Sequence, residues 1–170
     1  KPVTGVALMQ LFEQGLFQLS DPISKFLPEF KNQQVYISGS FPMFITEPVK
    51  REILVRDLLT HTSGLSYSIN YKSHVDEAYR KAFNISDPTA SLVAKEKIDL
   101  EEFCKRIASL PLEFSPGEQW LYSVSIDVCA RLVEVMSGKK IDEYFEENIF
   151  KPLEMNNTGF YVPEENLKNL

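Results

Sequence analysis

Cysteine and histidine are scarce in this sequence of 170 residues, which contains two of each. Cys104 and Cys129 each lie in an amphipathic helical pattern, the usual setting for a small buried apolar side chain. They can form a disulfide only if two helices meet at these positions. Together with His61 and His74 they make no cluster of the spacing that holds a metal ion. We therefore expect neither a metal site nor a cofactor.

Basic stripes and long apolar runs are missing as well. The net charge is -6 and the pI is near 5.0, which disfavours nucleic acid as a partner, because a phosphate-binding surface needs concentrated positive charge. The apolar stretches are interrupted well before the roughly 20 residues that span a bilayer. No signal-peptide pattern begins the chain, but its start resembles the interior of a longer polypeptide. Secreted, periplasmic and cytoplasmic locations therefore stay open, as does the oligomeric state.

Apolar residues make up 44% of the sequence and aromatic residues 12%, enough for one domain with a sizeable core. No internal repeat or domain linker is present. Helical spacing and capping residues predict helices over residues 2–14, 99–110, 125–137 and 141–150, a short helix after Asp21 and a helical turn over 56–60. The side chains expected to face the core from these helices are Leu8, Leu11, Phe103, Leu132 and Val133.

Strand signals are weak and short. Residues 35–38 and 43–45 are rich in β-forming side chains and predict either a small hairpin or an extended loop. Residues 160–162 predict a closing strand. A long polar segment follows Gly64, and its loop character suits a region that lines a cleft. The aromatic side chains scattered through it are Tyr67, Tyr71, His74 and Tyr79.

The first residues predict an apolar helix that begins close to Lys1. Pro2 limits the helix to about one turn upstream, since a proline inside a helix removes a backbone hydrogen bond and clashes with the preceding turn. A positive charge in the first turn opposes the helix dipole. Lys1 is thus a poor choice for helix stability. Taken alone, it is most simply a solvated lysine at the end of a chain.

Four segments together resemble a known family: residues 1–9, the run Leu-Leu-Thr-His-Thr-Ser-Gly-Leu at 58–65, Trp-Leu-Tyr-Ser-Val at 120–124, and residues 152–160. They resemble the serine hydrolases related to class C β-lactamases, which include penicillin-binding DD-peptidases, β-lactamases and carboxylesterases. The segments occur in the family's order and at roughly its spacing. The resemblance implies an α+β fold of the β-lactamase/transpeptidase type. Residues 1–170 would form part of that domain, mainly its helical region and the helix that bears the nucleophile.

The resemblance also implies two catalytic residues. Lys1 matches the lysine of the Ser-x-x-Lys motif, whose serine would lie three residues earlier, one helical turn away on the same face. Tyr122 matches the tyrosine of the Tyr-Ser-x motif, which can pass a proton between the lysine and the serine. We therefore expect the Lys1 amine and the Tyr122 hydroxyl to be within hydrogen-bond reach, directly or through one water. Without the family, Tyr122 would be interpreted as a core aromatic residue.

The residues after Tyr122 are candidates for substrate contact. Where related β-lactamases carry an asparagine that can bond a substrate amide, this chain has Val124, which cannot. This difference favours an esterase-like or peptidase-like activity over lactam hydrolysis. Ser123 is a second polar candidate, although it also suits a helix cap.

Neither His61 nor Ser63 is predicted to do chemistry. His61 follows a helical turn and precedes Gly64, so we interpret it as part of a helix terminus, and the family uses no histidine there for catalysis. Ser63 lies in a Thr-Ser-Gly turn rather than in the Gly-x-Ser-x-Gly elbow of a nucleophilic serine.

The sequence therefore predicts a serine hydrolase that forms an acyl-enzyme with an ester, amide or lactam. Its partner would be a small-molecule or peptide-like acyl substrate. The alternative is a catalytically silent relative that keeps the fold and serves as a binding or scaffolding module.

Overall fold

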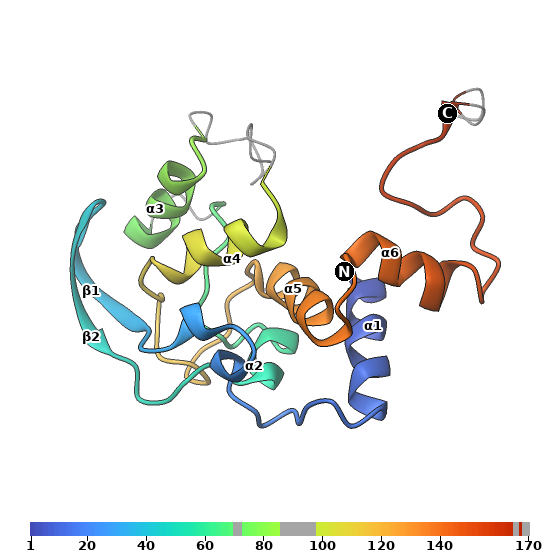
Figure 1. Ribbon diagram of the computed structural model, residues 1–170. Helices are drawn as coiled ribbons and strands as arrows, with labels where there is room; N and C mark the ends of the chain where they lie inside the picture. The colour runs from blue at the N-terminus through green and yellow to red at the C-terminus, as the bar shows by residue number, and fades with distance from the viewer. Residues whose placement is uncertain (70–72, 86–97, 165–166, 168–170) are drawn as a thin grey trace.

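The computed structural model describes residues 1–69, 73–85, 98–164 and 167. A central helix, α5 (Ser125–Ser137), is surrounded by the other helices, with a β-hairpin at one side of the molecule (Figure 1). The remaining helices are α1 (Pro2–Glu13), α2 (Val55–Leu59), α3 (His74–Ala82), α4 (Leu100–Ala108) and α6 (Ile141–Phe145). The 3-10 turns Ile23–Lys25 and Pro28–Phe30 connect α1 to the hairpin.

Local sequence accounts for the ends of the helices. The Asp99 side chain accepts the Glu102 N–H at 2.9 Å and begins α4. Gly138 ends α5 with φ at 71°, the left-handed conformation that glycine adopts without a steric penalty. Gly15 follows the end predicted for the first helix and adopts the same left-handed conformation, with φ at 75°. The predicted helices at 2–14, 99–110 and 125–137 are confirmed to within two residues.

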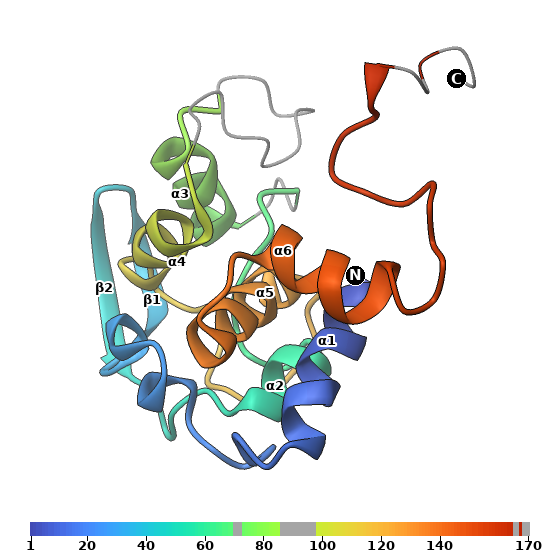
Figure 2. The same cartoon turned by 45° about the vertical axis from the view of Figure 1, so that its right-hand side comes forward.

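Helices α1 and α5 lie side by side in both views of the molecule (Figure 1 and Figure 2) and contribute to a core that also includes residues of α2, α3, α4 and α6. Leu8 and Leu11 of α1 and Leu132 and Val133 of α5 are buried, as predicted. The fifth predicted core residue, Phe103, is only half-buried and packs its ring against Phe83 at 5.1 Å between centroids. Cys104 and Cys129 are buried in the same core as free thiols, so the disulfide alternative does not apply.

The two central β-rich segments form a hairpin. Strands β1 (Gln34–Ser40) and β2 (Met43–Pro48) pair antiparallel, with an irregularity between Tyr36 and Ser38. The Leu112 N–H and C=O bond the hairpin at Gln34 and Tyr36, which attaches it to the segment after α4.

Two local predictions are wrong. Residues 160–162 form no strand, because no partner strand lies beside them among the described residues, and a single strand leaves its backbone groups unpaired. The predicted helix over 141–150 is confirmed in extent, and its second half is π-helical: α6 is followed by the turn Glu146–Phe150. Part of the polar segment after Gly64 is helical rather than looped, since α3 begins where the Ser73 hydroxyl accepts the N–H groups of Val75 and Asp76. Tyr79 of α3 is fully buried, while Tyr71 lies outside the described residues.

The described helices include none with both the length and the apolar character of a membrane-spanning segment.

Candidate functional site

Lys1 and Tyr122 lie together in the folded protein. The Lys1 Nζ is 4.6 Å from the centroid of the Tyr122 ring, over its face. Lys1 is the residue that precedes α1, and Tyr122 lies three residues before α5. Because α1 packs along α5, the start of one helix and the approach to the other meet at the same place. The tertiary structure thus brings together the two residues that the motifs single out.

Tyr67 forms a second wall around the same ammonium group. Its ring centroid is 5.1 Å from the Lys1 Nζ and 5.4 Å from the centroid of the Tyr122 ring. A cation within about 6 Å of an aromatic face is attracted by the negative electrostatic potential of the ring. Two aromatic faces therefore hold Lys1 in place. Tyr67 was noted in the sequence only as one of several aromatic residues, since no helical or strand spacing relates it to Lys1.

Buried polar groups hold the short segment that carries Tyr67. The Asp76 carboxylate accepts the Ser66 hydroxyl and the Ser68 N–H, each at 2.6 Å, and pairs with Arg80 at 3.1 Å. The Ser66 N–H donates to the Tyr79 hydroxyl. Asp76 and Tyr79 both belong to α3, so this helix holds the Tyr67 backbone against the site.

Glu113 joins these polar groups from the segment after α4. Its carboxyl group contacts the hydroxyls of Ser66 and Ser73. Burial raises the pKa of the Glu113 carboxyl, and the two hydroxyls oppose that rise only in part.

The His61 ring also contacts Tyr122. The two ring centroids are 4.8 Å apart, and the His61 ring also meets the edge of Trp120 at 6.3 Å. Burial lowers the pKa of His61, and the nearby positive charge of Lys1 lowers it further. The histidine is therefore held in its neutral form beside the ammonium group.

A chain of buried hydroxyls runs from His61 into the core. The Ser123 hydroxyl lies 3.2 Å from the His61 Nδ1 and 2.7 Å from the Ser125 hydroxyl, which lies 2.8 Å from the Ser63 hydroxyl. All three serines are buried. Ser63 is therefore a structural residue, in agreement with the interpretation that it is not a nucleophile.

One acidic side chain also faces the site. Asp127, in the first turn of α5, is half-buried, and its burial raises the pKa of its carboxyl while Lys1 lowers it. No motif pointed to Asp127 in the sequence. Asp127 is the third residue of α5, and its N–H donates to the Val124 carbonyl at 2.9 Å.

The two candidates for substrate contact, Ser123 and Val124, are buried in the described structure. Ser123 is fully buried and Val124 is 1% exposed, with its N–H bonded to the Ser66 carbonyl at 3.1 Å. Both side chains point into the protein because they begin the packing of α5. Neither side chain is accessible to a substrate in the described structure. The side chain of Tyr122, the residue before them, is 37% exposed.

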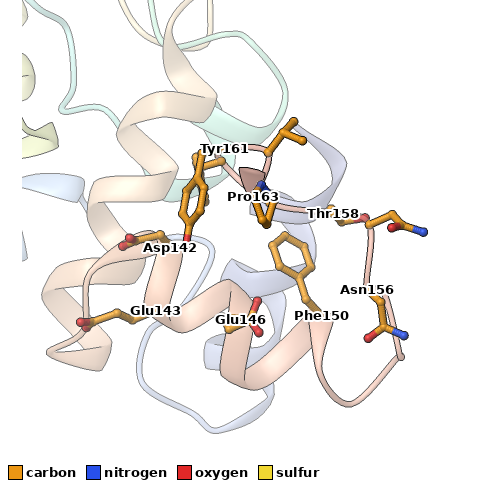
Figure 3. Close-up of a pocket in the computed structure, with 12 residues that line it drawn as sticks. Asp142, Glu143, Glu146, Phe150, Asn156, Thr158, Tyr161 and Pro163 are labelled. Atoms are coloured by element: carbon orange, nitrogen blue, oxygen red, sulfur yellow. The ribbon is translucent and has the colours of Figure 1, made fainter. Parts of the chain in front are cut away.

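A separate open depression of about 840 Å³ lies between α6 and residues 156–163 (Figure 3). Its walls include the Phe150 and Tyr161 rings and the carboxylates of Asp142 and Glu146. Neither Lys1 nor any of the residues around it lines this depression. Among the described residues no group of three or more His, Cys, Asp or Glu side chains could hold a metal ion, here or at Lys1.

The sequence of this chain is similar to those of known proteins. The sequence matches the protein family described as Beta-lactamase over residues 1–170. It is 34% identical over 154 residues to the acyltransferase calJ of Penicillium decumbens, covering 90% of this chain and 34% of that protein. It is 32% identical over 164 residues to the esterase EstB of Burkholderia gladioli, covering 96% of this chain and 37% of that protein.

A solved structure gives the same fold. EstCE1, described as a hydrolase with promiscuous acyltransferase activity, superimposes with a TM-score of 0.72 at 28% identity, over 98% of this chain and 39% of that chain. The α+β, β-lactamase/transpeptidase-like fold predicted from the motifs is thereby confirmed. The chain spans little more than a third of the length of these relatives.

Proposed function

Because the chain belongs to the β-lactamase family, we propose that the protein containing it is a serine hydrolase or acyltransferase that forms an acyl-enzyme with an ester substrate. The observation that supports this function best is the Lys1 ammonium against the ring of Tyr122. Relatives over this region are named as esterases and acyltransferases.

In the proposed reaction the nucleophile is a serine three residues before Lys1, one helical turn away. Its oxygen forms a bond to the acyl carbon as its proton passes to the phenolate oxygen of Tyr122. The bond from the acyl carbon to the alcohol oxygen then breaks, and Tyr122 gives the same proton to the departing alcohol and becomes a phenolate again. Water or a second alcohol attacks the acyl-enzyme by the reverse path. The Lys1 ammonium stabilises the negative charge that the Tyr122 oxygen carries before it accepts the serine proton and after it protonates the alcohol.

Esters are preferred to lactams on the evidence of the relatives rather than of Val124. The side chain at position 124 is buried, so an asparagine there would not reach a substrate without a rearrangement. A peptidase-like activity on amides is the second candidate within the same mechanism.

The test uses the intact protein and p-nitrophenyl butyrate. We expect hydrolysis, a mass increase of one butyryl group on the proposed serine after rapid acid quenching, and a loss of at least about 100-fold in kcat for Tyr122→Phe, since a general acid-base group contributes roughly 100 to 10,000-fold. Tyr161→Phe is the matched control. It removes a phenol hydroxyl from a side chain that is 82% exposed and outside the site, so kcat should not change.

Two results would contradict this function. Equal activity of the Tyr122→Phe variant and the unmodified protein would remove Tyr122 from the mechanism. A folded intact protein that neither hydrolyses the ester nor acquires the acyl group would favour the silent binding or scaffolding module instead.

A further inference from the structure

His61 adopts a backbone conformation that is uncommon for a residue other than glycine. Its φ is 56°, in the left-handed region, although the glycine of the same turn lies three residues later. A side chain with a Cβ pays a steric penalty there. Such a conformation persists where the surrounding contacts overdetermine it, and it is common at functional sites. The contacts of His61 therefore need an explanation.

Both peptide N–H groups that flank Tyr122 donate to His61. The Leu121 N–H donates to the His61 carbonyl oxygen at 2.9 Å, and the Ser123 N–H donates to the His61 Nδ1 at 3.2 Å. The imidazole ring lies against the Tyr122 ring itself, at 4.8 Å between centroids. One residue thus contacts the Tyr122 segment before, at and after the tyrosine. The left-handed turn is what directs the carbonyl and the ring toward the same segment.

The geometry also defines the protonation state of the ring. A nitrogen that accepts an N–H must carry a lone pair, so the proton of the neutral imidazole is on Nε2. The Ser63, Ser125 and Ser123 hydroxyls can donate in sequence toward Nδ1, each accepting from the one before. The Ser63 oxygen accepts the Leu65 N–H at the far end of this chain. The burial of His61 and the positive charge of Lys1 both lower the pKa of His61, and this also favours the neutral ring.

We propose that His61 is a positioning residue for Tyr122: its carbonyl oxygen, its Nδ1 and its ring hold the tyrosine against the Lys1 ammonium. The proposal rests on the proposed function, in which Tyr122 transfers the proton. His61 itself touches neither the substrate nor the reacting atoms. Its role is to place the phenol of Tyr122, and the chemistry is left to Tyr122 and Lys1.

Two substitutions separate the contacts of the side chain from the conformation of the backbone. Asparagine and glycine both tolerate the left-handed conformation. In His61→Asn the amide oxygen occupies the place of Nδ1 and can accept the Ser123 N–H, whereas His61→Gly leaves that donor unpaired. A difference between the variants therefore reports the loss of the side chain with its acceptor, and not the strain of the left-handed backbone.

Kinetics in the intact protein gives the first readout. We expect His61→Gly to lower kcat for p-nitrophenyl butyrate at least about 10-fold with KM nearly unchanged, because a misplacement of about 1 Å can cost about 100-fold. His61→Asn should keep most of the activity. In a Tyr122→Phe background, His61→Gly should have no further effect, because residues that act as a unit are not additive. Loss by the same factor in both backgrounds, or an asparagine variant no better than glycine, would overturn the proposal.

A second readout does not depend on activity. Crystal structures of the intact His61→Gly and His61→Asn variants should show the Tyr122 ring displaced from Lys1 in the first and retained in the second. An unmoved Tyr122 ring in the glycine variant would refute positioning by His61. If Tyr122→Phe alone leaves kcat unchanged, the proposed function fails, and these structures still decide whether His61 places the tyrosine.

Discussion

The ammonium of Lys1 lies over the faces of both Tyr67 and Tyr122, whose ring centroids lie 5.1 Å and 4.6 Å from its Nζ. The two tyrosines come from different parts of the chain: Tyr67 lies in the segment before α3, and Tyr122 lies in the segment before α5. Each ring contact alone is worth about 0.5 to 2 kcal/mol. Together they restrict a flexible side chain to one place beside the proposed proton-transfer residue.

Tyr67 should act through its ring face rather than through its hydroxyl. We expect Tyr67→Leu to lower kcat by several-fold to about 30-fold, corresponding to the loss of one cation–π contact. Tyr67→Phe, which keeps the ring, should retain nearly full activity. Steady-state kinetics with p-nitrophenyl butyrate on the intact protein would measure both. A phenylalanine variant as impaired as the leucine variant would show that the hydroxyl is the important group.

The ion pair between Arg51 and Asp57 supports the turn that carries His61. Asp57 is 3% exposed and accepts two hydrogen bonds from Arg51, at 2.6 and 2.9 Å, together with the Leu54 N–H and the Thr62 hydroxyl. We expect Asp57→Asn to lower the free energy of unfolding by about 2 to 3 kcal/mol, less than the loss of a fully buried pair because Arg51 is about a third exposed.

Urea unfolding of the two proteins would measure this difference. Glu77→Gln is the control, because it makes the same change of carboxylate to amide in an exposed pair with Lys81. Its unfolding midpoint should move far less. Equal shifts for the two variants would show that the Arg51–Asp57 pair does not stabilise the turn.

The stability of the protein should depend on pH through His61. Its pKa is lowered from 6.5 in the folded state, first by burial and then by the charge of Lys1. The unfolded chain therefore binds the proton more readily than the folded protein below pH 6.5, so this contribution to stability is present above pH 6.5 and is lost as the pH falls toward the folded pKa.

Urea unfolding between pH 5 and 8 would measure this contribution. The His61→Asn variant, which cannot titrate, should lose less stability than the unmodified protein as the pH falls through this window. Parallel pH profiles for the two proteins would contradict the lowered pKa.

Two glycines in the same backbone conformation should differ in their tolerance of a side chain. At Gly64 (φ 83°) an added Cβ would lie 2.3 Å from the Phe114 carbonyl oxygen, whereas at Gly138 (φ 71°) it meets no atom within 4 Å. Gly138→Ala should therefore cost only the strain of the left-handed backbone, about 1 to 2 kcal/mol. Gly64→Ala should cost about 1 to 3 kcal/mol more, as overpacking does. Thermal or urea unfolding of the two alanine variants would show the difference, and similar values would mean that the segment around Phe114 moves away without cost.

Local patterns were enough to predict most of the helices. The Asp99 cap, the apolar spacing of α5 and the glycine that ends it depend on neighbours a few residues away, and the structure keeps all of them. Where a prediction needed a distant partner, it was less accurate. Residues 160–162 have the composition of a strand, but a strand requires a second strand for its hydrogen bonds.

The sequence by itself determined the family, the fold class and the two residues, Lys1 and Tyr122, that its motifs mark for chemistry. Only the tertiary structure decided what surrounds them. It placed Tyr67 and His61 against the ring of Tyr122, and it buried Ser123 and Val124, because these arrangements depend on how α1, α3 and α5 pack. Motifs record residues close together in the chain, whereas a site is made of side chains that packing brings together from separate segments.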